Sequence, residues 1–111
     1  MIEVTLSDAL RIAPARMTVT AGVPVTFVIT NGGLLDHEFY LGDATAQAEH
    51  EAAMRSDAGT MAHDRANSVA VPPGQTKELT YSFPLHGEWL AGCHVTGHYA
   101  GGMRATITVT E

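Results

Sequence analysis

Three side chains that bind soft metal ions lie close together near the C-terminal end of the sequence. Cys93, His98 and Met103 share one glycine-rich stretch, with four residues between Cys93 and His98 and four between His98 and Met103. A thiolate, two imidazoles and a long, weak thioether bond form the donor set of trigonal, redox-active copper sites. The spacing therefore predicts that one loop supplies three ligands to a copper ion.

The second imidazole of such a site must come from elsewhere in the chain. His37 follows a glycine-rich turn at residues 31–33 and begins a strand-like stretch. A β-sandwich can bring this early strand next to the loop between the last two strands, and a ligand set fixed by the fold lets copper change charge with little rearrangement. We expect His37, Cys93 and His98 to be the strong ligands. Met103 is expected as the weak axial ligand of one Cu(I)/Cu(II) ion per chain.

The Cys-x4-His-x4-Met pattern before a final strand-like segment, with Asp-His-Glu-Phe at residues 36–39, resembles the cupredoxin family of type 1 (blue) copper proteins. The resemblance covers roughly residues 16–110. Within the family, the sequence is similar in particular to the single-domain, plastocyanin- or azurin-like cupredoxins of bacterial copper tolerance. It implies electron transfer or periplasmic copper homeostasis and a redox partner protein. It also implies a periplasmic or otherwise extracytoplasmic location and electron exchange through the edge of His98.

Two positions in the ligand loop depart from related patterns. Thr96 stands where the family often has a proline, which would stiffen the loop. His94 follows Cys93 as in the His-Cys-His motif of multicopper oxidases, but Gly92 replaces the leading histidine and the chain has no His-x-His pair. We therefore expect no trinuclear oxygen-reducing cluster and no enzyme activity. Since successive strand side chains face opposite sides, His94 is expected to point away from the metal, at the surface or behind the ligands.

A second group of histidines and methionines lies in the middle of the chain. His50 and Met54 are four residues apart and share one face of a predicted helix, and Met61 and His63 follow shortly after. Because imidazole and thioether suit Cu(I), these residues could form an auxiliary copper site or a docking surface. The alternative is a solvated helix that packs Met54 inward. His86 is expected to be a surface residue of a turn.

Strand-like patterns cover most of the remaining sequence. Alternating apolar and polar residues between turn signals predict about eight short strands, at residues 2–6, 17–20, 24–30, 37–41, 67–71, 76–83, 87–93 and 103–110. Residues 44–58 contain neither Gly nor Pro and predict one helix, which Asp43 or Thr45 would cap and Gly59 would end. We expect an all-β fold, a Greek-key antiparallel β-sandwich of the cupredoxin type with one short helical insertion around residues 44–58.

Length, composition and charge restrict the classes of function. The 111 residues, 45% hydrophobic and 16% charged, fit a single cupredoxin domain over residues 1–111, and we favour a monomer. A net charge of -6 disfavours binding to nucleic acid or to an anionic lipid surface. No apolar run approaches the roughly 20 residues that cross a bilayer, so we expect no membrane insertion. Met1 leads directly into strand-like sequence, so any export signal is expected to have preceded this sequence.

Other functions could use the same residues. In a subunit of an oligomeric copper oxidase or reductase, His94 or His63 would complete a second copper site across an interface, and more than one copper ion would bind per chain. A redox-silent copper carrier would bind Cu(I) tightly without a reversible redox couple. A thiol hydrolase based on Cys93 is disfavoured, since no oxyanion-hole signature or third orienting group is evident. Electron carriage and copper buffering would both use the predicted site.

Overall fold

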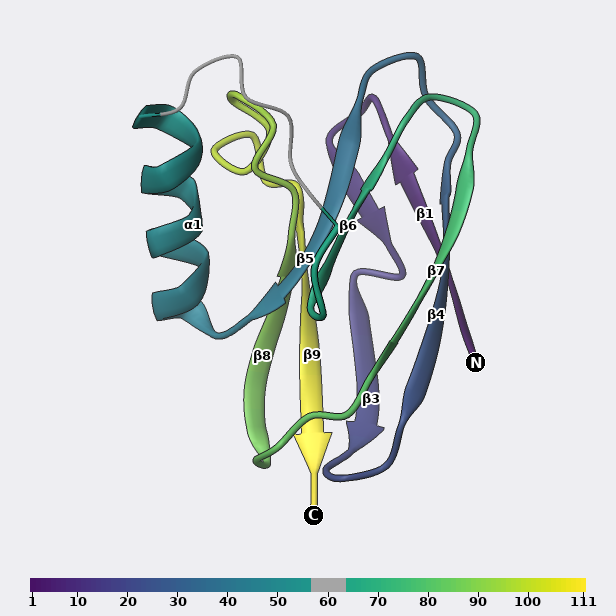
Figure 1. Cartoon of the computed structure of the whole chain (residues 1–111), viewed down its shortest axis with the longest axis vertical. Helices are drawn as coiled ribbons and strands as arrows, with labels where there is room; N and C mark the ends of the chain where they lie inside the picture. Colours follow the sequence, from purple (N-terminus) through teal and green to yellow (C-terminus); the bar gives the residue numbers. More distant parts are fainter. Residues whose placement is uncertain (57–63) are drawn as a thin grey trace.

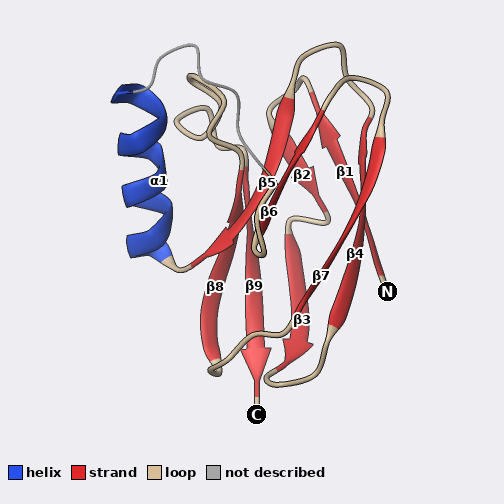
Figure 2. Ribbon diagram, in the orientation of Figure 1, coloured by secondary structure: helices blue, strands red, loops and turns tan. Residues whose placement is uncertain are grey.

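Two β-sheets packed face to face, with one helix beside them, form the fold shown in Figures 1 and 2. This computed structural model describes residues 1–56 and 64–111. In chain order the elements are β1 (Ile2–Ser7), β2 (Arg11–Ala13), β3 (Arg16–Thr20), β4 (Val25–Asn31), β5 (His37–Gly42), α1 (Ala44–Ser56), β6 (Ser68–Val71), β7 (Thr76–Tyr81), β8 (Gly87–Gly92) and β9 (Arg104–Thr110). One sheet has the strand order β2-β1-β4-β7 and the other has the order β3-β9-β8-β5-β6. The predicted β-sandwich with a helical insertion is confirmed.

The strand pairing refines the predicted antiparallel arrangement, because each sheet contains one parallel pair. β1 pairs with β4 in parallel, and β3 pairs with β9 in parallel, whereas the other pairs of named strands are antiparallel. The chain changes sheet between β2 and β3 and again between β3 and β4, so these neighbours in sequence cannot form hairpins. The short strand β2 was not predicted, because its three residues are too few to show an alternating pattern.

The interior between the sheets is apolar and contains three phenylalanines. Alternate residues of β1, β4 and β9 are buried, as expected for strands with one face against a core. Phe27 of β4 lies with its ring centroid 5.2 Å from that of Phe39 on β5 and 6.4 Å from that of Phe83, and all three side chains are fully buried. Aromatic packing of this kind fixes one sheet against the other, and with it the position of β5.

The start of β5 and the end of β8 lie at the same end of the sandwich. The two strands pair antiparallel, with Tyr40 opposite Gly92. His37 is the first residue of β5, and Cys93 directly follows β8. Figure 1 shows the loop between β8 and β9 at this end of the molecule, near the last turn of α1. The fold thus brings residues from the two predicted ligand segments together.

Helix α1 is capped at its start and fastened to the second sheet near its first turn. The carboxylate of Asp43, one of the two predicted capping residues, accepts a hydrogen bond from the Ala46 N–H at 2.8 Å. Gln47 is 1% exposed, and its side-chain amide donates to the carbonyl of Tyr40 at 3.0 Å and to that of Leu90 at 3.1 Å. One buried side chain therefore connects the helix to both β5 and β8.

The described part of the helix agrees with the predicted insertion. The prediction placed a helix over residues 44–58, and the structure shows it over Ala44–Ser56. The remaining two predicted residues and the expected stop at Gly59 lie outside the described residues. Within residues 1–56 and 64–111, no helix has the length and apolar character needed to cross a membrane.

Candidate metal centre

Three donor atoms from the two predicted segments meet at one buried point. Cys93 Sγ lies 3.5 Å from Nδ1 of His98 and 3.9 Å from Nδ1 of His37. The three donor atoms all lie within 4.8 Å of one another, and the residues are 1%, 0% and 8% exposed for His37, Cys93 and His98. These separations suit one ion bound at about 2.0–2.3 Å from each nitrogen and sulfur. The thiol and two imidazoles are the donor set that trigonal copper sites use, so the residues present fit copper.

Burial controls the protonation of Cys93. Burial raises the pKa of the Cys93 thiol to about 12, although the N–H of Glu38 donates a hydrogen bond to Sγ at 3.3 Å and opposes this rise. In the absence of metal the thiol is therefore protonated near neutral pH. Since the thiolate is the form that binds metal, the ion has to replace the proton on Sγ.

Asp8 fixes the orientation of the His37 ring. Its carboxylate lies 2.9 Å from Nε2 of His37 and accepts hydrogen bonds from the N–H groups of Leu34 at 2.7 Å and Leu35 at 3.3 Å. The Leu34 N–H, and then the bond to His37, hold the pKa of Asp8 below its ordinary value. An ionised carboxylate only accepts, so Nε2 of His37 carries the proton and its Nδ1 lone pair faces Cys93.

Asp8 was not predicted from the sequence. It precedes His37 by 29 residues, and a lone aspartate in a turn carries no signal of such a contact. Its approach depends on Gly33, because a Cβ atom there would collide with the Asp8 carboxylate. The glycine-rich turn at residues 31–33 was the one feature that marked the region.

The loop after β8 is closed by its own backbone hydrogen bonds. The N–H of His98 donates to the carbonyl of Val95 at 2.8 Å, and the N–H of Met103 donates to the carbonyl of His98 at 3.1 Å. Cys93 and Met103 are joined by a further backbone bond of 3.1 Å. Gly97 lies within this closed loop at φ +84°, a conformation that favours glycine. The loop thus has internal support even though it lacks the proline that Thr96 replaces.

The other two loop residues that we predicted as ligands are both buried. Met103 is 0% exposed and directly precedes β9, within the backbone bonds that close the loop. Burial, and then the neighbouring His37, lower the pKa of His98, so its imidazole is neutral at neutral pH. A neutral imidazole is the form that binds metal.

Behind the donor cluster lies a buried polar network that the sequence did not reveal. The Glu38 carboxylate is 1% exposed; it accepts a hydrogen bond from the His94 N–H at 2.7 Å and lies 3.0 Å from Nε2 of His50. The His94 ring lies between Gln47 and Glu51 of α1, at 2.6 Å and 2.7 Å. His94 is 1% exposed, so of the two expected positions, at the surface or behind the ligands, the structure shows the second. The physical reason is that α1 covers this side of the loop.

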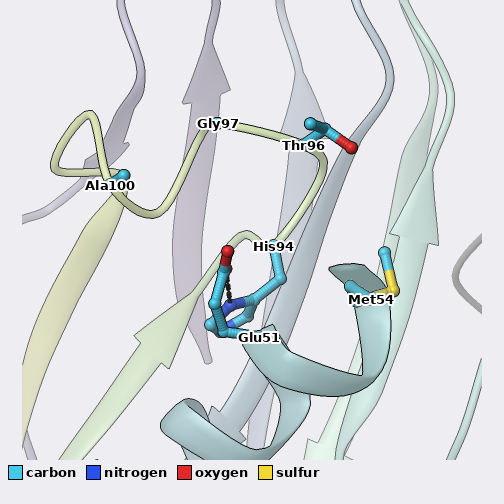
Figure 3. Close-up of a pocket in the computed structure, with 6 residues that line it drawn as sticks. All are labelled: Glu51, Met54, His94, Thr96, Gly97 and Ala100. Atoms are coloured by element: carbon cyan, nitrogen blue, oxygen red, sulfur yellow. Dashed lines mark hydrogen bonds and ion pairs between the residues drawn. The ribbon is translucent and has the colours of Figure 1, made fainter. Parts of the chain in front are cut away.

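The second predicted group of histidines and methionines is only partly described. His50 stacks on Tyr40, with ring centroids 4.0 Å apart and an interplanar angle of 4°. Met54 instead lines a pocket together with Glu51 and His94, which Figure 3 shows. The predicted residues Met61 and His63 lie outside the described residues.

His86 occupies the predicted surface turn, where its side chain is 63% exposed and lies 3.5 Å from Glu111.

Gly92 occupies a position with no room for a side chain. A Cβ atom at Gly92 would collide with Gln47 and would meet Tyr99 at 2.7 Å and Nε2 of His94 at 3.0 Å. A histidine at this position, which the His-Cys-His motif would require, would have to displace the side chains of Gln47, Tyr99 and His94. The structure therefore gives a steric reason for the departure at Gly92.

A β-sandwich of this topology, with a thiol and two imidazoles converging at one end, defines a cupredoxin. Residues 8–111 match the family model described as "Multicopper oxidase". The copper-resistant cuproprotein CopI of Rubrivivax gelatinosus is 34% identical over 97% of this chain and 65% of its own length. CopI of Pseudomonas aeruginosa is 36% identical over 97% of this chain and 75% of its own length. The chain therefore belongs to the family described as multicopper oxidase and, among cupredoxins, to the group of the CopI cuproproteins.

A solved structure supports the same fold. Reduced auracyanin from Roseiflexus castenholzii superposes with a TM-score of 0.87 at 22% identity, covering 99% of this chain and 96% of that one. Copper is the metal of cupredoxins, and in this chain His37, Cys93 and His98 are grouped as its potential ligands. The chain spans 65% of the length of the Rubrivivax protein, which is less than two thirds.

Proposed function

We propose that this chain is a type 1 copper protein that carries electrons, or buffers copper, in copper tolerance outside the cytoplasm. His37, Cys93 and His98 would hold one copper ion per chain, and Met103 would be its weak fourth ligand. The observation that carries the proposal is the convergence of one thiol and two imidazole nitrogens within 4.8 Å, all buried. The relatives named as copper-resistant cuproproteins support the role in tolerance.

The residues around the centre support a preformed copper site. Bound copper would supply one-electron redox chemistry. Cys93 would give up its proton when copper binds, and the Glu38 N–H donates a hydrogen bond to its sulfur. Asp8 holds His37 by its Nε2–H, and the backbone bonds of the loop hold His98 beside Cys93. Because the fold and these hydrogen bonds hold the ligand side chains, little rearrangement is expected to accompany a change in copper charge.

We further propose that the chain is not an enzyme by itself and works with a redox partner protein. The family description as multicopper oxidase makes an oxidase the second candidate. A trinuclear cluster needs several additional histidines, and the filled space at Gly92 argues against the His-Cys-His arrangement. A redox-silent carrier would share the ligands and would differ in lacking a reversible couple.

The test is copper reconstitution of the purified apoprotein. One equivalent of Cu(II) should give strong thiolate-to-copper absorption and the electron paramagnetic resonance signal of a thiolate-bound ion. Cys93→Ser should abolish the absorption because the covalent copper–sulfur bond is lost. His86→Gln, at the exposed histidine, is the matched control and should keep it. A coloured Cys93→Ser protein would refute the assignment, and a wild-type protein that binds copper without colour would favour the carrier.

A further inference from the structure

A second group of potential metal ligands lies beside the first, on the side that α1 covers. A pocket of about 110 Å³ lies between the helix and the ligand loop, lined by Glu51, Met54, His94, Thr96, Gly97 and Ala100. Figure 3 shows the Glu51 carboxylate joined to the His94 ring, with Met54 on the following turn of the same helix. A carboxylate, an imidazole and a thioether therefore border one small space.

The orientation of Gln47 determines which nitrogen of His94 carries a proton. Its side-chain amide nitrogen donates to three backbone carbonyls, those of Tyr40, Gly42 and Leu90, at 3.0, 3.4 and 3.1 Å. The amide oxygen of Gln47 must then face Nε2 of His94, 2.6 Å away. Because an amide oxygen only accepts, Nε2 carries a proton.

This arrangement prepares the other nitrogen of His94 for metal binding. Nδ1 lies 2.7 Å from the Glu51 carboxylate, so the two groups share a proton or, in its place, a cation. A metal-binding histidine almost always donates its other ring N–H to an oxygen acceptor, which fixes the ring. Here the side-chain oxygen of Gln47 is this acceptor, and the Gln47 amide is itself held by three hydrogen bonds to backbone carbonyls.

We propose that Nδ1 of His94, the Glu51 carboxylate and the Met54 thioether form a second copper site in this pocket. Imidazole and carboxylate suit Cu(II), and the thioether adds a soft donor. Binding displaces the proton that His94 and Glu51 share. The site is distinct from the Cys93 centre, and the chain links the two through adjacent residues, Cys93 and His94.

In the alternative, these residues have a purely structural role, in which the His94–Glu51 ion pair connects the helix to the loop and binds no metal. The His94 side chain is 0% exposed and that of Glu51 is 18% exposed, so a buried ion pair alone would also hold the loop. Unlike a structural ion pair, a copper site predicts a second bound ion, and the loss of this ion should leave the first ion in place.

The experiment is copper loading of the full chain with three equivalents of Cu(II), followed by desalting and measurement of copper per chain. The wild type should retain two copper ions. One gives the thiolate absorption, and the other gives a second paramagnetic signal without strong visible absorption. Glu51→Gln and His94→Gln should each retain one ion and keep the thiolate absorption, which also reports that the variant is folded. Met54→Leu should weaken the binding of the second ion by a smaller factor than Glu51→Gln or His94→Gln.

Matched controls separate this pocket from surface binding. Glu49→Gln, on an exposed position of the same helix, and His86→Gln, at the exposed turn, should both keep two ions. The proposal is wrong if the wild type retains one ion, or if Glu51→Gln and His94→Gln still retain two. Loss of both ions together in those variants would show that the pair only positions the loop, and would likewise overturn the proposal. If the wild type shows no thiolate absorption but still binds an ion that Glu51→Gln and His94→Gln lose, the proposed function is refuted and this site stands.

Discussion

Two donors of the proposed copper centre, His37 and Cys93, each have a neighbouring group that contacts them by a hydrogen bond. Asp8 selects the nitrogen of His37 that bears a proton, and the Glu38 N–H donates to the sulfur of Cys93. These neighbours are charges or dipoles at hydrogen-bond distance from a ligand, so they act on the redox potential as well as on the geometry.

The carboxylate of Asp8 should lower the reduction potential. Its negative charge, held next to His37, stabilises Cu(II) more than Cu(I). Asp8→Asn removes the charge and keeps one of the two oxygens, so that either the Leu34 N–H, which donates to Oδ2, or the Leu35 N–H, which donates to Oδ1, loses its acceptor. We expect the potential to rise by on the order of 59 mV, a tenfold change in the ratio of the two affinities. Voltammetry measures it, and Asp36→Asn, at an exposed site, is the control. An unchanged potential in Asp8→Asn would show that Asp8 only orients the ring.

Met103 tests the proposed axial bond. Met103→Leu keeps a buried apolar side chain but removes the thioether, which as a weak donor favours Cu(II). The thiolate absorption should remain and the potential should rise, again by on the order of 59 mV. Voltammetry and visible spectra report both. Loss of the absorption would mean that Met103 is needed for the site to form, whereas an unchanged potential would remove it from the ligand set.

Copper uptake should release the proton of Cys93. Burial raises the pKa of this thiol to about 12, so between pH 6 and pH 8 it is protonated without metal and ionised with it. This group alone makes the apparent copper affinity rise about tenfold per pH unit in that range. Calorimetry in buffers of different ionisation enthalpy counts the protons. A Cys93 that released none would already be a thiolate in the apoprotein.

At the scale of elements, α1 is attached to the sheet by few contacts, and Gln47 makes several of them. Its amide bonds to carbonyls of β5 and β8 and its oxygen faces His94. His50 and Glu51 of the same helix contact Glu38 and His94, so the helix is held by several polar side chains, among which Gln47 makes the most hydrogen bonds.

Gln47→Ala should destabilise the protein by about 1–3 kcal/mol, since it leaves buried carbonyls and the His94 N–H without this partner. Gln75→Ala, at an exposed side chain, should change the free energy of unfolding little. Denaturant unfolding of the apoproteins measures both. Equal stability of the two variants would mean that water replaces Gln47 at the buried carbonyls.

The elements show what the sequence could and could not predict. The ligand loop was predictable because the positions of Cys93, His98 and Met103 are close in sequence, and most strands were predictable from alternation. The contact of Asp8 with His37 and the contacts of His94 with Glu38, Gln47 and Glu51 were not, since they join residues 29 to 56 positions apart through single hydrogen bonds. Such bonds leave no periodic pattern in the sequence.

At the scale of the whole molecule, net charge governs encounters with redox partners. The chain carries a formal charge of -6 and has no basic excess that would attract anions. An acidic protein attracts cationic reagents and repels anionic ones, with a strength that depends on salt. A physiological partner that presents a basic surface would meet this chain faster than a neutral one.

Electron exchange of the copper-loaded protein should therefore depend on salt with opposite sign for two small reagents. The rate with a cationic ruthenium ammine complex should fall as ionic strength rises from 0.01 to 0.15 M, because the Debye length contracts from about 30 to about 8 Å. The rate with anionic ferricyanide should rise over the same range. Stopped-flow absorption at the thiolate band measures both. A rise with the cationic reagent and a fall with the anionic one would mean that the charge near the exposed edge of the site differs in sign from the charge of the whole chain. No exchange with either reagent would favour the redox-silent carrier.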